Sequence, residues 1–454
     1  MQEITANVLR TFEPKSSGAA FIDRAFVYFC AVSFPLFSAS ILVLQPNWSK
    51  VFLALSVAAS LLGLFVMRLR RDLYIRALIL FGACAAFVII KLLHDWTLGL
   101  PMLLDKYLSF VTRLTIAIFF AVALSDKLQL MLRALCTVSA VIVVHAILGQ
   151  LLVIFLRPAD APLLDAAEAN SFTYYQIAWL FFYSQTMYVT EAIHIYRAHG
   201  VIWEPGIFQF FCNYLIVYGF SQFGASKKRL LVTLGVAGII VSTSTMGALL
   251  AATIILVNTK FSWRSIVGVG AIVVIPSIFI FANKFDIGAA QSLSTVIRLV
   301  DLEVPLNYAM QFPILGVGND SSVVRLLGVH SYLLDYLLSA GQQQLLSEYM
   351  DTIFDTDRVF NTSNGLLALL MQYGVVFAGV YIYGFRNFAR WTGLGYSFFI
   401  LILFTTFNEP ISLTVLFLWM AMHGLVMPRY LPNARAAHVA FGGTPSPSSM
   451  QESI

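Results

Sequence analysis

The chain has 454 residues, of which 59% are apolar and only 11% are charged, and its formal net charge at pH 7 is +5. A soluble domain with a polar surface does not have this composition, so we expect an all-α polytopic membrane protein. We interpret the excess of basic residues as a signal of membrane topology, and no nucleic-acid partner is expected.

Predicted membrane spans follow one another through most of the chain. A helix needs about 20 apolar residues to cross the roughly 30 Å hydrocarbon core of a bilayer. About twelve spans are predicted, at residues 25–44, 51–67, 77–93, 110–124, 134–156, 200–222, 230–243, 246–259, 265–283, 364–385, 395–407 and 411–427. The seventh and eighth are short, so this pair is either two spans or one broken or re-entrant element.

These spans form a single predicted transmembrane domain, residues 25–427. The segment before it, 1–24, is polar and charged, and we expect no cleavable signal there. The tail after it, 428–454, is rich in Ser, Pro and Gly and is expected to be disordered.

Basic residues predict the orientation of the spans, because Lys and Arg collect in short cytoplasmic connections. The two terminal segments and every second connection hold eighteen Lys and Arg against six acidic residues, whereas the other connections hold eight against sixteen. Both termini are therefore predicted to be cytoplasmic. The two longest connections, 157–199 and 284–363, are predicted to be periplasmic, and connections of that length usually carry function.

The first long connection contains an aromatic segment, SFTYYQIAWLFFYSQTMY, at residues 171–188. Aromatic rings concentrate at membrane surfaces, so one interpretation is an interfacial helix. The alternative is a floor on which sugar rings stack, with Tyr174, Tyr175 and Trp179 as substrate-binding residues. Both interpretations hold together if the substrate is a glycolipid.

The sequence RAHGVIWEPG, residues 197–206, lies where this connection enters a predicted span. A charge at the bilayer centre costs at least about 2.5–3.5 kcal/mol, so Arg197 and Glu204 need a compensating interaction. They either neutralise each other or, with His199, bind an anionic, membrane-tethered substrate. Pro205 interrupts helical hydrogen bonding and can open a polar pocket beside Glu204.

The second long connection is acidic, with four basic residues, Arg298 and Arg325 among them, and nine acids. Apolar residues recur at helical spacing around Arg298, which predicts a helix that lies on the surface or dips back into the membrane. Such a helix would aim Arg298 toward Arg197 across a cavity, although an arginine on a solvated helix face has the same pattern. GVGN at 316–319 is predicted to be a turn, because its glycines accept positive φ.

Motifs for a metal or a cofactor are not found. Cys30, Cys84, Cys136 and Cys212 fall inside predicted spans without paired spacing, and no nucleotide-binding or zinc pattern occurs in the sequence. We therefore expect neither a metal nor a cofactor.

Four segments, in their order and predicted sidedness, resemble the O-antigen polymerase and ligase family, the Wzy-type membrane glycosyltransferases. RAHGVIWEPG is similar to the family's Arg-x-x-Gly element followed by an acidic or amide residue and proline. STSTMG at 242–247 occupies the place of its small polar turn, and FPILGVGN, which follows Arg298, is similar to its Pro-x-Leu-Gly-x-Gly element. TSNGLLALLMQYGVV, residues 362–376, resembles the segment that re-enters the membrane.

Two departures from the family pattern favour one activity over another. Thr245 stands where many relatives carry arginine, and Ser363 precedes Asn364 where ligases typically have histidine. His330 in the same connection can substitute for that histidine. The resemblance therefore favours a repeat-unit polymerase over an O-antigen ligase.

What the resemblance implies is a GT-C-like fold and a metal-independent glycosyl transfer on the periplasmic face of the bacterial inner membrane. Donor and acceptor would be undecaprenyl-diphosphate-linked repeat units, and the product would be O-antigen, capsule or exopolysaccharide. Arg197 and Arg298 would stabilise the diphosphate leaving group, because arginine presents a planar, permanently charged fork to phosphate oxygens. Glu204 or His330 would take the proton of the acceptor hydroxyl.

The remaining implied contacts concern binding. His199, Arg325 and Asn364 would bind the substrate, and a chain-length-regulating co-polymerase is an implied partner besides the lipid bilayer. A lipid-linked oligosaccharide flippase or transporter is the rival class, since it would use the same intramembrane charges, but its usual inverted repeats are not evident in the sequence. A non-catalytic assembly subunit is disfavoured by the convergent Arg and Glu positions.

Overall fold

Among the residues that this computed structural model describes, six helices are long and apolar enough to cross a bilayer, so the chain is a multi-pass membrane protein. The structure describes residues 17–40, 46–67, 71–99, 104–156, 174–177, 181–190, 193–202, 204–259, 292–317, 364–409 and 411–427. The six candidate spans are Phe21–Ala39, Asn47–Val66, Arg71–Thr97, Leu104–Ala123, Ser125–Phe155 and Gly365–Thr392.

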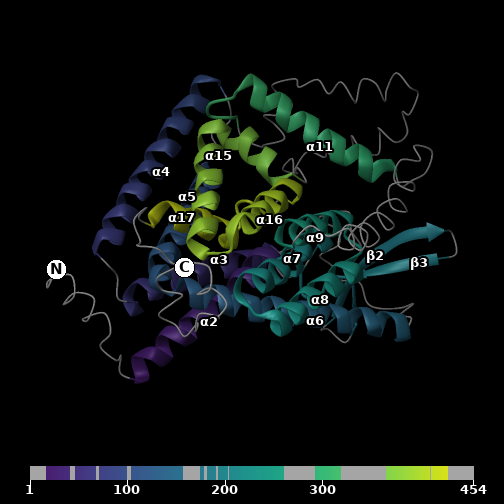
Figure 1. Cartoon of the computed structure of the whole chain (residues 1–454). Helices are drawn as coiled ribbons and strands as arrows, with labels where there is room; N and C mark the ends of the chain where they lie inside the picture. Colours follow the sequence, from purple (N-terminus) through teal and green to yellow (C-terminus); the bar gives the residue numbers. More distant parts are fainter. Residues whose placement is uncertain are drawn as a thin grey trace, which may run out of the picture.

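The helical fold predicted from the apolar blocks is confirmed (Figure 1). The larger helices are α2 (Ser17–Ala39), α3 (Pro46–Val66), α4 (Arg71–Thr97), α5 (Leu104–Ala123), α6 (Leu128–Leu156), α7 (Pro205–Gln222), α8 (Ala225–Ser242), α9 (Thr245–Asn258), α11 (Ser292–Gln311), α15 (Gly365–Thr392), α16 (Gly395–Asn408) and α17 (Val415–Val426). Eleven predicted spans each overlap one of these helices, and the span predicted at 265–283 lies outside the described residues.

The predicted pair of short spans consists of two separate helices, α8 and α9. Thr243, in the turn between them, has a positive φ of 48°, which ends α8. The Oγ of Ser244 then accepts a 3.1 Å hydrogen bond from the nitrogen of Gly247 and caps α9. STSTMG is therefore a turn between two apolar helices, as the sequence predicted.

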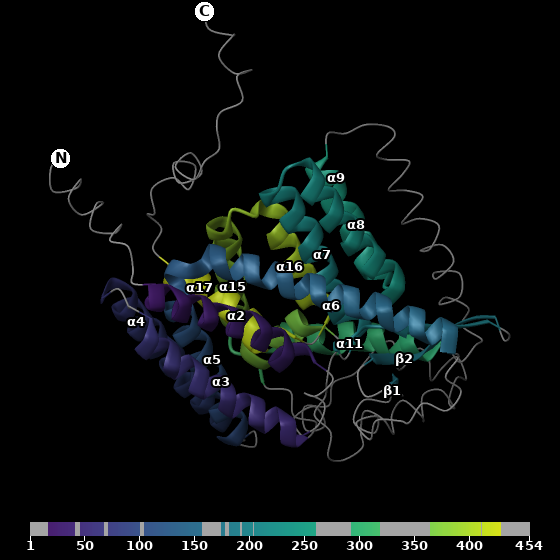
Figure 2. The same ribbon diagram turned by 90° about the horizontal axis from the view of Figure 1, so that it is seen from below.

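One of the two interpretations of the aromatic segment, the interfacial helix, was wrong, because its described residues, 174–177 and 181–188, belong to a small antiparallel sheet. The strands are β1 (Tyr174–Ile177), β2 (Phe181–Thr190) and β3 (Ile193–Ala198), in the order β1-β2-β3. Tyr, Phe, Trp, Thr and Ile, which dominate this segment, fit strands better than helices, and a strand partner follows within a few residues. Figure 2 shows the sheet at the far end of α6, whose Gly149 lies against Phe181 of β2.

Connections that were predicted to be cytoplasmic lie together. Asp23 at the start of α2 forms a 2.8 Å ion pair with Lys127, between α5 and α6. Three further hydrogen bonds connect other helix ends to the end of α15 and the start of α16. Gln129, at the start of α6, donates from Nε2 to the carbonyl oxygen of Thr392 at 3.1 Å, and Ser221, at the end of α7, donates from Oγ to that of Leu394 at 3.4 Å. Asn258, at the end of α9, donates from Nδ2 to Ser397 Oγ at 2.6 Å. This grouping agrees with the alternation that the basic residues predicted.

Aromatic and small side chains form the core. Trp419 of α17 is fully buried, with ring centroids 5.3 Å from Phe34 of α2 and 5.2 Å from Phe388 of α15. α15 and α17 cross very closely, because a Cβ on Gly424 would lie 1.9 Å from the carbonyl oxygen of Gly384. Small residues at such crossings are typical of membrane helices, which associate through close packing.

Candidate functional site

Helix ends that are far apart in the sequence meet at one end of the helical body. Ser40, after α2, pairs with Ile202, just before α7. The Oγ of Ser38 accepts a 3.1 Å hydrogen bond from the nitrogen of Leu416 on α17. Glu409, after α16, lies against both Gly206 of α7 and Gly365 of α15. We call residues 38–40, 199–202, 204–209, 242–247, 364–367, 405–409 and 411–416 the junction; its parts lie at or beside connections that were predicted to be periplasmic.

Glu204, the predicted base, is the N-cap residue of α7. Its backbone is extended (φ −136°, ψ 136°), and its carbonyl oxygen accepts hydrogen bonds from the nitrogens of Ile207 and Phe208. Pro205 follows in the first turn, where a missing N–H removes no helical hydrogen bond. The half-buried carboxylate of Glu204 forms no capping hydrogen bond with its own helix. α7 therefore begins five residues later than the predicted span at 200–222.

The residues before α7 form a tight turn that joins the sheet to the helix. Gly200 has φ 64°, a conformation that favours glycine. His199, predicted to bind substrate, is fully buried, and its Nδ1 donates a hydrogen bond to the carbonyl oxygen of Ile202. Arg197 lies on β3, opposite Ser184 of β2. Arg197 therefore lies only a few residues before the start of α7 along the chain.

Asn364, also predicted to bind substrate, begins α15. Its side-chain oxygen accepts a 2.9 Å hydrogen bond from the nitrogen of Leu367, the usual geometry of a helix N-cap. Ser412 donates a 2.9 Å hydrogen bond from Oγ to the carbonyl oxygen of Gly365. Asn364 is buried, so the structure assigns it a capping role that fixes the start of α15 in the junction.

The start of α9 lies beside the second turn of α7. Asn213 donates a 3.3 Å hydrogen bond from Nδ2 to the carbonyl oxygen of Gly247. Gln209 is fully buried, and its Oε1 lies 3.1 Å from the place that a Cβ on Gly247 would occupy. Within the described part of the chain, neither polar atom of the Gln209 amide has a hydrogen-bond partner. The glycine in STSTMG therefore lets a buried amide reach the first turn of α9.

Four of the described helices thus begin at the junction, namely α7, α9, α15 and α17. The first N–H groups of a helix have no partner within it and carry partial positive charge, which favours a carboxylate or a phosphate nearby. Glu409, which is only 5% exposed, places a carboxylate against the first turn of α7, and it was not among the predicted site residues. The sequence does contain a pattern that could have identified Glu409, because the Glu-Pro pair at 204–205 occurs again at 409–410.

A segment that follows α11 lies in a break of α15, and we call this segment, residues 313–317, the strap. In a continuous helix the nitrogen of Val375 would donate to the carbonyl oxygen of Met371. Val375 instead donates to the carbonyl oxygen of Pro313 at 2.7 Å, and Met371 accepts from the nitrogen of Val317 at 2.8 Å. The strap thereby satisfies both backbone groups, which a membrane interior requires.

Two glycines permit this insertion. Gly316 and Gly374 have φ values of 64° and 72°. A Cβ on Gly316 would lie 2.4 Å from the carbonyl oxygen of Met371, and one on Gly374 would lie 2.1 Å from that of Ile314. The turn predicted at 316–319 is confirmed at Gly316, and two of the segments that carry the family resemblance are thereby in direct contact.

The helix predicted around Arg298 is confirmed as α11. Its second half packs on α15 and buries Val304 and Tyr308, and burial raises the pKa of the Tyr308 phenol. Figure 1 shows α11 extending from α15 toward the side of the body where the sheet lies. Arg298 is on the first half of this helix.

The other predicted site residues are not among the residues of the junction. Tyr174 and Tyr175 lie on β1. Trp179, Arg325 and His330 lie outside the described residues. The structure therefore brings three predicted residues into the junction, namely His199, Glu204 and Asn364.

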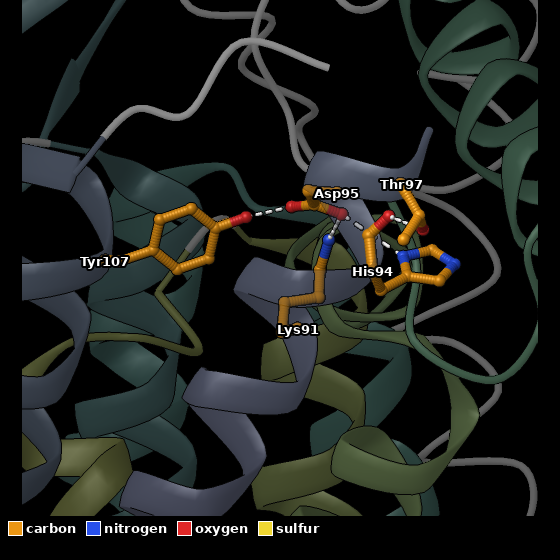
Figure 3. Close-up of polar contacts among 5 residues, drawn as sticks. All are labelled: Lys91, His94, Asp95, Thr97 and Tyr107. Atoms are coloured by element: carbon orange, nitrogen blue, oxygen red, sulfur yellow. Dashed lines mark hydrogen bonds and ion pairs between the residues drawn. The ribbon is translucent and has the colours of Figure 1, made fainter. Parts of the chain in front are cut away.

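A second polar cluster, which the sequence analysis did not predict, joins α4 to α5 (Figure 3). Asp95 accepts hydrogen bonds from the ammonium group of Lys91 and from the hydroxyl of Tyr107, and His94 Nδ1 lies 3.2 Å from Asp95 Oδ1. Lys91 and Asp95 are 1% and 3% exposed. A carboxylate with this many donors is fully paired, so the cluster stabilises the α4–α5 contact.

Among the described residues, no three His, Cys, Asp or Glu side chains are placed to hold a metal ion.

No protein-family model and no curated protein matches the chain.

Proposed function

We propose that the chain is an integral-membrane glycosyltransferase that polymerises polyprenyl-diphosphate-linked oligosaccharide repeat units at the periplasmic face of the bacterial inner membrane. The observation that carries this proposal is the meeting of the four resembling segments. The starts of α7 and α15 both contact Glu409, the start of α9 contacts α7, and the strap completes the break in α15. Segments that are scattered in the sequence thus belong to one region.

The proposed reaction transfers the glycan of the donor from its diphosphate to a hydroxyl of the acceptor. The oxygen of an acceptor hydroxyl attacks the anomeric carbon of the donor, the bond from that carbon to the diphosphate oxygen breaks, and polyprenyl diphosphate leaves with the electron pair. The hydroxyl proton passes to Glu204 or His330. Arg197 and Arg298 supply permanent positive charge for the leaving diphosphate, and the helix starts at the junction add partial positive charge.

The sugars of the substrate would be recognised by the aromatic segment. Tyr174, Tyr175 and Trp179 offer ring faces for stacking, and His199, Arg325 and Asn364 offer polar contacts. A chain-length-regulating co-polymerase would act on the polymer that leaves this site.

A lipid-linked oligosaccharide flippase is the second candidate, favoured by the Lys91–Asp95 pair. Ionisable residues inside membrane helices often mark transport pathways. The polymerase is preferred because three of the four resembling segments reach the junction and the fourth contacts α15, which begins there, whereas none of them lies at this pair.

The decisive experiment is reconstitution of the purified chain in liposomes with lipid-linked repeat units. A ladder of products on a gel is expected, and Arg197→Ala at matched protein amount is the control that should give none. Movement of substrate between leaflets without a ladder would favour the flippase, and a single transfer to a lipid A-core acceptor would favour a ligase.

A further inference from the structure

We propose that Glu409 is a positioning residue that sets the separation of Glu204 and Asn364. This inference rests on the proposed function, because it concerns two residues to which that function gives roles. Glu204 lies two residues before Gly206 and Asn364 directly before Gly365, and both glycines contact Glu409.

The side chain of Glu409 lies against the first turn of α7. A Cβ on Gly206 would lie 1.7 Å from Oε1 and 2.8 Å from Oε2 of this carboxylate. Glu409 is 5% exposed, so the carboxylate is inside the junction and not on its surface. The partial positive charge of the start of α7 favours an anion in this place. Any side chain at position 206 would displace it.

The main chain of Glu409 lies against α15. A Cβ on Gly365 would lie 2.4 Å from the carbonyl oxygen of Glu409 and 2.8 Å from that of Thr406. The nitrogen of Glu409 donates a 2.9 Å hydrogen bond to the carbonyl oxygen of Thr405, and its own carbonyl accepts a 2.8 Å bond from Ile411. The main chain is therefore fixed to the last turn of α16 and to α15 together.

One residue thus spans the two helix starts, with its main chain on α15 and its side chain on α7. Asn364 is next to one contact and Glu204 is two residues from the other. Misplacement of a catalytic group by about 1 Å can lower a rate about 10²-fold. Loss of this contact should therefore lower kcat through the position of Glu204. KM should change less, because most of the proposed substrate contacts belong to the two long connections and not to Asn364.

Four variants test the contact in the polymerisation assay: Glu409→Gln, Glu409→Ala, Gly206→Ala and the double variant Gly206→Ala with Glu409→Ala. We expect Glu409→Ala and Gly206→Ala each to lower kcat, up to about 10²-fold. Glu409→Gln, which keeps the shape, should retain more activity than Glu409→Ala. The double variant should be no worse than Glu409→Ala, because the clash at Gly206 is gone. Asp105→Ala removes an exposed carboxylate from α5 and is the matched control.

A second measurement does not depend on activity. The rate at which a membrane-impermeant maleimide modifies Glu204→Cys is compared with and without Glu409→Ala, and the unmodified chain gives the background from its own cysteines. We expect the rate to rise when Glu409 is truncated. If the unmodified chain does not polymerise repeat units, the proposed function is wrong. The labelling rates alone then test whether Glu409 positions the start of α7. An unchanged labelling rate, or full kcat in both Glu409→Ala and Gly206→Ala, would overturn the positioning role.

Discussion

Lys91 and Asp95 lie one helical turn apart on α4 and form an ion pair whose side chains are 1% and 4% exposed. Tyr107 and His94 complete the pairing of the carboxylate. Burial of two charges is costly, and the pair persists because each charge offsets the burial of the other.

Removal of one partner of this pair should destabilise the protein strongly. Asp95→Ala leaves a buried ammonium group, so we expect the free energy of unfolding to fall by about 3–5 kcal/mol. The double variant Lys91→Met with Asp95→Leu replaces both charges by apolar side chains and should recover most of that loss. Thermal unfolding in detergent measures both. If the separate losses of Lys91→Met and Asp95→Leu simply added in the double variant, the two residues would not be coupled.

The break in α15 gives a prediction with a control in the same helix. Gly374→Ala places a Cβ where φ is 72° and where the carbonyl oxygen of Ile314 would be 2.1 Å away, so it should cost about 1–3 kcal/mol from backbone strain alone. Gly379→Ala, where a Cβ meets nothing within 4 Å, should be neutral or stabilise by up to about 1 kcal/mol. Hydrogen exchange at the Val317 amide reports whether the strap has separated. Equal effects of the two substitutions would contradict the strap contact.

The proposed role of Arg197 depends on the shape of its side chain as well as its charge. Arg197→Ala and Arg197→Lys should both abolish or severely lower chain extension, because lysine keeps the charge but loses the bidentate contact with phosphate. The product ladder measures this, with membrane insertion confirmed for each variant. Full activity of Arg197→Ala would remove the central residue of the proposed reaction.

Glu204→Gln separates the two interpretations of this carboxylate, because it removes the charge and nearly keeps the shape. If Glu204 is the base, the variant should bind lipid-linked repeat units and fail to extend them. If Glu204 is a counter-ion of Arg197, extension should survive in part. Substrate binding and ladder formation are measured on the same preparation.

Membrane topology can be tested by cysteine labelling in intact cells. Labels at Ser171 and Asp351 should react from the periplasm, and a label placed after Pro428 should not. The contacts among the predicted cytoplasmic connections, Asp23 with Lys127 for example, agree with the part of this prediction that puts those connections on one side of the membrane. A cytoplasmic signal from Asp351 would reverse it, together with the proposed face of the reaction.

Local patterns of the sequence predicted the helices because apolar blocks of this length have few alternatives in a membrane protein. The helix around Arg298, the turn before Gly247 and the turn at Gly316 follow from periodicity and from small residues in the same way. The aromatic segment at 171–188 was the exception. Aromatic rings suit a membrane surface in a helix or in a strand, so the choice of a strand depended on the pairing with β3, which composition alone does not show.

Contacts between distant segments were beyond the reach of these patterns. The spacing of Lys91 and Asp95 is visible in the sequence, but their burial depends on how α5 packs on α4. Glu409 gains its place from two glycines that belong to other helices, and the break at Gly374 is stable because of a strap from a different part of the chain. To predict any of these features, one must already know which helices and helix ends are in contact.

The order of synthesis matters for the break in α15. The ribosome makes residues 313–317 before residues 365–392, so the partners of Met371 and Val375 exist when α15 enters the bilayer. Each backbone group left unpaired in hydrocarbon costs several kcal/mol, a penalty that this order avoids. A circularly permuted chain that made α15 first would have to insert a broken helix without its strap, or insert it straight and bend it afterwards.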